Sequence, residues 1–172
     1  GAAMPDRLEG LATDGTRVFT KADCTVAAFT ATTGATAWTT QLTPRSGSSC
    51  GDGHEPVVDS GVLLTQSWGS ACALRATDGA ELWWVPNGRP SYSAVAGGVW
   101  IKADMPAFTS PIKAYDLQTG ELLWSNSTTA DDTEQYVSIA GDLVVVLAKE
   151  RYVSYLRGYD RTTGELVWNG GQ

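Results

Sequence analysis

The chain has 172 residues, of which 42% are hydrophobic and 18% are charged, a balance that supports a globular domain and excludes a disordered chain. Its 12 Lys and Arg residues against 19 Asp and Glu residues give a net charge of −7, and no basic cluster offsets this locally. Such a chain repels phosphate backbones and anionic lipids, so nucleic acid is excluded as a partner. The longest wholly apolar run, Leu143–Ala148, is far shorter than the roughly 20 residues that span a bilayer, which excludes direct membrane insertion.

The first predicted unit, residues 5–42, contains two hairpins of short strands. An inner strand at Arg17–Thr20 follows a Gly-containing turn, and the segment Ala28–Trp38 alternates in strand fashion on both sides of Gly34. Glycine adopts the positive φ that a tight hairpin turn demands. The pattern predicts a strand, a Gly turn, a strand, a variable loop, a strand, a second Gly turn and a last strand.

Three further units follow, at residues 54–86, 92–126 and 134–170, and each contains a gap-free copy of the same segment. In every copy a Trp lies four residues after a Gly, and successive Trp residues are 41 to 45 residues apart. The four pairs are Gly34 and Trp38, Gly79 and Trp83, Gly120 and Trp124, and Gly164 and Trp168. A period in the low forties is that of one four-stranded propeller blade, with the Trp packed between neighbouring blades.

We therefore predict an all-β fold, a β-propeller of four four-stranded antiparallel blades over residues 5–172. Gly1–Met4 is interpreted as a cloning remnant. The connections between blades and the central turn of each blade emerge on one face of a propeller, and recognition usually takes place on such loops. This loop face includes the long connections Thr43–Pro56, Pro86–Ser93 and Asn126–Gln135. The predicted ligand-binding or partner-binding residues on it are Asp52, His54, Trp68, Tyr92, Phe108 and Tyr152.

The repeat has the pattern Ala-x-Asp-x-x-Thr-Gly-x-x-x-Trp, which resembles that of the quinoprotein-like β-propellers, the pyrroloquinoline-quinone type. The third and fourth copies match it closely, whereas Thr30 and Arg75 replace the usual Asp in the first two. The resemblance covers nearly the whole chain. It implies a bacterial, extracytoplasmic protein in a family that includes quinone-dependent alcohol dehydrogenases. Non-catalytic members of the family are an envelope assembly lipoprotein and sensor domains of bacterial kinases.

The residues that the resemblance would require for catalysis are not found in this sequence. The dehydrogenases carry two adjacent cysteines and a calcium held by carboxylate and amide side chains, but Ser49 and Gly51 flank Cys50. The best acidic cluster, Asp131–Glu134, is interpreted as a solvated loop. The only histidine, His54, lies in a Gly-rich loop that offers no preorganised catalytic partners. We predict no catalytic residues, no cofactor and no metal site.

The three cysteines predict one disulfide and one thiol, which suits an exported protein. Cys24 lies in the central turn of the first blade and Cys50 in the connection to the second, so both belong to the loop face. A Cys24–Cys50 bridge is predicted, with Cys72 free in a buried strand. Cys50–Cys72 is the alternative pairing.

Four blades of this family do not ordinarily close a ring, so the first and last blades would leave broad apolar faces uncovered. We expect either that two chains pair as a homodimer into an eight-bladed ring or that further blades are missing, and we favour both over a ring that four blades close alone. The leading functional hypothesis is a non-catalytic scaffold or recognition module that binds a protein, peptide or small ligand. It would be a kinase sensor domain or an envelope assembly factor. The alternative is a fragment of a quinone-dependent alcohol or sugar dehydrogenase.

Overall fold

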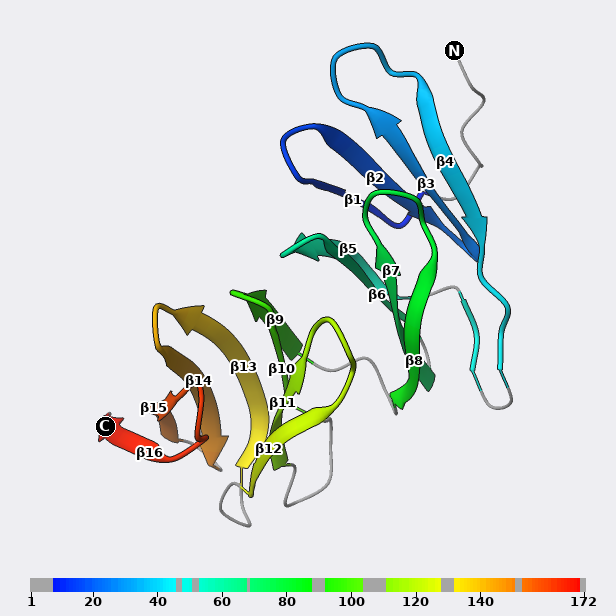
Figure 1. The fold of residues 1–172 in the computed structure, drawn as a ribbon. Helices are drawn as coiled ribbons and strands as arrows, with labels where there is room; N and C mark the ends of the chain where they lie inside the picture. The colour runs from blue at the N-terminus through cyan, green and yellow to red at the C-terminus, as the bar shows by residue number, and fades with distance from the viewer. Residues whose placement is uncertain are drawn as a thin grey trace. The chain divides into compact units, whose positions relative to one another are not determined.

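The computed structural model describes residues 8–45, 48–50, 53–67, 69–87, 92–103, 111–127, 132–150 and 153–170. In these ranges the chain forms sixteen strands and no helix. The strands make four antiparallel sheets of four strands each, and every sheet is built from consecutive strands (Figure 1). The prediction of an all-β fold with four four-stranded propeller blades is confirmed.

The first two sheets belong to one compact unit, which includes residues up to Pro90 together with Gln118–Gly120. The first sheet contains β1 (Gly10–Thr13), β2 (Arg17–Ala22), β3 (Thr25–Thr30) and β4 (Thr36–Gln41). The second contains β5 (His54–Asp59), β6 (Val62–Ser67), β7 (Gly69–Arg75) and β8 (Glu81–Asn87). Their shared core is apolar and includes Phe19, Val26, Ala28, Leu63, Cys72, Leu74 and Ala76.

The last two sheets belong to the second compact unit. The third sheet contains β9 (Tyr92–Ala96), β10 (Val99–Ala103), β11 (Pro111–Asp116) and β12 (Leu122–Ser127). The fourth contains β13 (Asp132–Ala140), β14 (Leu143–Glu150), β15 (Val153–Asp160) and β16 (Leu166–Gly170). Their core includes Ile101, Ile112, Ala114, Trp124, Val144, Val146 and Tyr159.

A β-bulge stands at the same point of the repeat in all four sheets. The pairing of the third strand with the fourth shifts between the first two residues of each repeated segment, at Ala28/Phe29, Ala73/Leu74, Ala114/Tyr115 and Gly158/Tyr159. The extra residue of the fourth strand immediately precedes the repeated Trp. A bulge redirects the side chains beside it. The bulge and the Gly turn, whose four glycines have φ between 67° and 74°, together set the position of the Trp.

The repeated Trp joins neighbouring sheets inside the first unit. The Trp38 indole Nε1 donates a hydrogen bond to the carbonyl of Ala76 at 3.0 Å. A Cβ added at Gly79 would lie 2.5 Å from the Trp38 ring, so only glycine fits there. A Cβ added at Gly120 would likewise lie 2.7 Å from the Trp83 ring.

The same contact recurs inside the second unit. Trp124 Nε1 donates to the carbonyl of Arg161 at 2.8 Å, and an added Cβ at Gly164 would lie 2.6 Å from the Trp124 ring. Asn126 Nδ2 also donates to the Gly164 carbonyl at 2.7 Å. The predicted packing of the Trp against the following blade is therefore present in both units.

All three long connections predicted for the loop face are shorter in the structure than the sequence indicated, and in the second of them Pro86 belongs to β8 and Tyr92 to β9. His54 begins β5, and Asp132–Gln135 form the start of β13. Cross-strand pairing extends these strands, since Asp132 pairs with Glu150 across a bulge in the β13–β14 hairpin. The interpretation of this acidic segment as a loop was wrong for Asp132 and Glu134, whose backbone is strand. Asp131 lies outside the described residues.

The turn between β1 and β2 depends on a single carboxylate. Asp14 accepts hydrogen bonds from the backbone N–H groups of Thr16 and Arg17 and from the Thr16 hydroxyl. Partial burial acts to raise the pKa of Asp14, but these hydrogen bonds outweigh it and lower the pKa to about 2. The ionised carboxylate is therefore the form that stabilises the turn.

We expect Asp14→Ala to lower the free energy of unfolding by about 1 kcal/mol at neutral pH, a modest loss because the turn is exposed. The folded-state pKa lies below the unfolded value, so this contribution is fully present above pH 4. It is lost as the pH falls through about 2. Urea unfolding of both proteins across this range measures the difference. A difference that stays constant down to pH 2 would contradict the role of the carboxylate.

Candidate functional site

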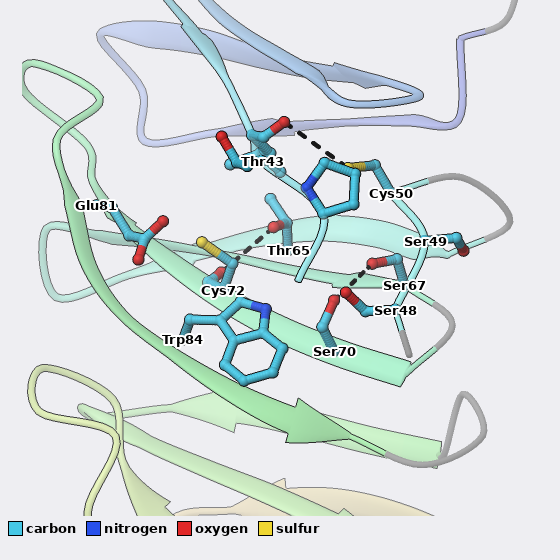
Figure 2. A pocket seen from close by; sticks show the side chains of 12 residues that line it. Thr43, Ser48, Ser49, Cys50, Thr65, Ser67, Ser70, Cys72, Glu81 and Trp84 are labelled. Carbon is cyan, nitrogen blue, oxygen red and sulfur yellow. Dashed lines mark hydrogen bonds between the residues drawn. The ribbon is translucent and has the colours of Figure 1, made fainter. Parts of the chain in front are cut away.

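The connection between β4 and β5 forms one wall of a small cavity in the first unit (Figure 2). The opposite wall comes from β6, β7 and β8 of the second sheet. The lining is Leu42, Thr43, Pro44, Ser48, Ser49, Cys50, Thr65, Ser67, Ser70, Cys72, Glu81 and Trp84. The cavity therefore lies where the sequence placed the first long connection of the loop face.

A disulfide and a buried lysine hold this connection in place. Cys50 is joined to Cys24 in the β2–β3 turn, with the two Cα atoms 4.7 Å apart. The fully buried Lys21 donates a hydrogen bond from Nζ to the Cys50 carbonyl at 2.6 Å and forms an ion pair with Glu9. The structure thus contains the Cys24–Cys50 pairing rather than the Cys50–Cys72 alternative. The connection is anchored to the first sheet at Cys50.

The interior of the cavity is polar and narrow. The Thr65 hydroxyl donates to the Cys72 carbonyl at 3.3 Å, and the hydroxyls of Ser67 and Ser70 are 3.1 Å apart, as Figure 2 shows. The cavity volume is ≈ 20 Å³, room for about one water molecule. Drug-sized ligands occupy pockets of roughly 300–1,000 Å³. The interior is too small for such a ligand, so any recognition here takes place at the rim.

Arg45, directly after the lining residue Pro44, contacts two residues of the cavity wall, Glu81 and Trp84. Arg45 Nη2 lies 2.6 Å from the Glu81 carboxylate, and its guanidinium carbon is 5.0 Å from the centre of the Trp84 ring. A guanidinium held over an aromatic face is oriented by both contacts. Sequence reasoning missed this pair. The available signals were Arg45 in the first long connection and Trp84 directly after the repeated Trp83.

Two of the six predicted binding residues lie within the described residues, and they belong to different units. His54 begins β5 in the first unit, and its Nε2 is buried without a hydrogen-bond partner among the described residues. Tyr92 begins β9 in the second unit and packs on Tyr136, with hydroxyl oxygens 3.2 Å apart and ring centroids 4.1 Å apart. The other four, Asp52, Trp68, Phe108 and Tyr152, lie outside the described residues.

Cys72 is the free cysteine of the three, and it lies buried in β7. Burial, with a smaller contribution from the negative charge of Glu81, raises the pKa of its thiol to about 12. Only a thiolate reacts readily with alkylating agents. The thiol is therefore held in its unreactive form.

We expect native protein to resist iodoacetamide at pH 8 and to take up one label per chain once denaturant exposes Cys72. Reduction of the denatured protein should raise this to three labels as Cys24 and Cys50 are released. Mass spectrometry counts the labels. Rapid labelling of Cys72 in the native protein would contradict its burial.

The described side chains do not provide a cluster of donors for the calcium that accompanies the quinone in the dehydrogenases. No group of three or more His, Cys, Asp or Glu side chains able to hold a metal ion occurs among the described residues. The sequence also lacks two adjacent cysteines. No step of a quinone-dependent oxidation can be assigned to these side chains. In addition, the described part of the chain contains no helix that is long and apolar enough to span a membrane.

Solved structures with the same fold come from several kinds of protein. BamB from Moraxella catarrhalis matches 95% of this chain and 61% of its own, at 15% identity and a TM-score of 0.57. The quinohemoprotein alcohol dehydrogenase from Comamonas testosteroni matches 96% of this chain and 35% of its own, at 16% identity and a TM-score of 0.68. Hsv2 from Kluyveromyces lactis matches 99% of this chain and 52% of its own, at 11% identity and a TM-score of 0.72. At these identities the likeness shows the fold alone.

The chain spans between about a third and three fifths of the length of these solved proteins. A comparison with curated proteins gives no significant sequence match. One family model does match, over residues 7–99, and it is described as outer membrane protein assembly factor BamB. This region covers more than half of the chain and includes the first two copies of the repeat. The chain belongs to this BamB-like family of PQQ-type propeller repeats.

Proposed function

We propose that the chain is a non-catalytic scaffold module that acts outside the cytoplasm and binds a protein or peptide partner through its loop face. The observation that carries this proposal is the anchored β4–β5 connection. Its disulfide to Cys24 and its hydrogen bond from Lys21 fix the backbone at Cys50, while Arg45 is exposed beside the Trp84 ring. Surfaces fixed before binding lose little entropy on association. Arg and Trp residues are enriched among those that dominate binding energy.

The family supports one version of this role over the other. The matching family is described as an outer membrane protein assembly factor, so an envelope assembly factor is favoured over a kinase sensor domain. A disulfide within the loop face suits an oxidising compartment. The small volume of the cavity favours a protein or peptide over a small ligand.

Site-specific photo-cross-linking in the native host tests this proposal. A benzophenone amino acid at Arg45 would report contacts of the loop face. The same group at Thr77, an exposed residue of the Gly79 turn in the second sheet, is the matched control. We expect defined protein adducts from position 45 at several times the yield from position 77. Equal yields from both positions, or no adduct from position 45, would refute recognition through this face.

The rival function is that of a quinone-dependent dehydrogenase fragment, since the Comamonas testosteroni enzyme shares the fold of this chain. Titration of the chain with pyrroloquinoline quinone and calcium, followed by absorbance, separates the two. We expect no saturable binding, because the chain has neither the adjacent cysteines nor a ligand cluster among the described residues. Saturable binding together with dye-linked alcohol oxidation would replace the scaffold proposal.

A further inference from the structure

Within each unit, one sheet supplies a Trp-bearing face and the next supplies a receiving face. In the second unit the Trp124 face of the third sheet packs on the fourth sheet. The receiving face there contains Val144 and Tyr159, which are paired across β14 and β15 and are buried, with Val137 packed beside them. The Gly164 turn completes the interface by accepting the indole ring.

The fourth sheet also has a Trp-bearing face, and it is uncovered. Side chains of neighbouring residues on a strand point to opposite faces, so the row Val145, Gly158 and Trp168 lies on the side opposite to Val144 and Tyr159. Trp168 is 37% exposed, whereas its counterpart Trp124 is 9% exposed. Leu147 and Leu156, which lie on the same face, are exposed as well, Leu156 by 45%.

The first sheet has a receiving face, and it is uncovered too. Its Trp38 face packs on the second sheet, so the opposite face contains Leu11, Val18 and Phe29. Leu11 stands at the position that Val137 occupies in the fourth sheet, and it is 57% exposed. These apolar residues match the receiving face of the fourth sheet in type and register.

The turn of the first sheet is also open. An added Cβ at Gly34 would meet nothing within 4 Å, whereas at Gly79 and Gly164 it would strike an indole ring. Gly34 nevertheless has the same positive φ, 67°. The carbonyl of Ala31, three residues before Gly34, stands where the corresponding carbonyls in the other turns accept the indole N–H.

We propose that the Trp168 face of one chain docks on the Gly34 face of a second copy of this chain. The chain thus carries both halves of an interface that it already uses within each unit. The indole N–H of Trp168 would donate to the carbonyl of Ala31, and the ring would cover Gly34. Because the two faces differ, the contact is heterologous, and two such contacts can close a pair of chains.

Docking requires the indole of Trp168 to change its orientation. The ring rests over Gly158 of its own sheet, so close that an added Cβ there would clash with it. The other three copies of the repeat have alanine at this position, Ala28, Ala73 and Ala114. A side-chain rotation moves the ring from its own sheet to the partner, and such rotations are fast on the time scale of association.

Light scattering on a sizing column tests the proposal with the 172-residue chain. We expect the wild-type chain to have at least twice the mass of one chain, and Trp168→Ala and Gly34→Ala each to raise the dissociation constant by more than about tenfold. Gly15→Ala is the matched control for Gly34→Ala, because Gly15 has φ 88° and equally open surroundings. It should leave the association unchanged. Thermal unfolding of each variant verifies that it folds.

Mixing the two association-defective variants gives the sharpest outcome. Trp168→Ala retains an intact Gly34 face, and Gly34→Ala retains an intact Trp168 face, so their mixture should form one-to-one pairs although neither variant pairs alone. A wild-type chain that stays monomeric up to about 1 mM would overturn the proposal and leave these faces to further blades of a longer protein. Association that both variants retain, or that their mixture fails to restore, would overturn it too. The cross-linking test at Arg45 is independent of all these results.

Discussion

Replacing Lys21 with methionine should lower the free energy of unfolding by about 3–5 kcal/mol. Lys21 is fully buried, and its ammonium group contacts the Glu9 carboxylate and the Cys50 carbonyl. Methionine fills a similar volume but cannot donate a hydrogen bond. The variant therefore leaves the largely buried Glu9 without its counter-charge and the Cys50 carbonyl without its donor. Urea unfolding followed by circular dichroism measures the loss.

The double variant Glu9→Gln with Lys21→Met is the control for this effect. Removing the charge of Glu9 as well should recover more than half of the lost stability, because an uncompensated buried carboxylate is the main cost. The Glu9→Gln single variant completes the thermodynamic cycle. If Lys21→Met is as stable as the wild type, Lys21 neither stabilises Glu9 nor anchors the β4–β5 connection at Cys50.

Replacing Gly164 with alanine should lower the free energy of unfolding by about 3 kcal/mol or more. Two costs add at this position. An L-residue at φ 74° is strained by about 1–2 kcal/mol. The new Cβ would also lie 2.6 Å from the Trp124 ring, and overpacking of this kind costs about 1–3 kcal/mol.

Gly141→Ala separates these two costs, because Gly141 has φ 62° in the same unit and nothing within 4 Å of an added Cβ. We expect it to lose about 1 kcal/mol, from the backbone alone. Thermal and urea unfolding of the two variants side by side give the contribution of the Trp contact. Equal losses of stability in the two variants would show that the packing of Trp124 does not require a residue without a side chain at position 164.

The blades could be predicted from the sequence because their determinants are local. A Gly turn followed by a Trp at a fixed distance recurs four times, and the spacing alone indicates the strands between. The disulfide was predictable for a related reason, since Cys24 and Cys50 fall in connections that emerge at the same end of the blades.

The contacts that hold the candidate site together depend on residues far apart in the sequence. Lys21 lies in a strand, where a lysine is normally expected to reach solvent, and only the folded chain reveals Glu9 beside it. Arg45 and Trp84 are separated by 39 residues and meet through the packing of two sheets. The four bulges could not be predicted either, because the alternation of residues within one strand does not show which residues of the next strand they pair with.

The recurrence of the bulge at one point of every sheet has a consequence for how such a protein can change over time. Each sheet contains its own turn, its own bulge and its own Trp, so its strand pairing is the same at every place in the series. Unequal recombination between the coding segments of two repeats would therefore delete or duplicate whole sheets while every remaining junction still fits. Chains of this kind can vary in length in steps of one repeat, without passing through an intermediate that cannot fold.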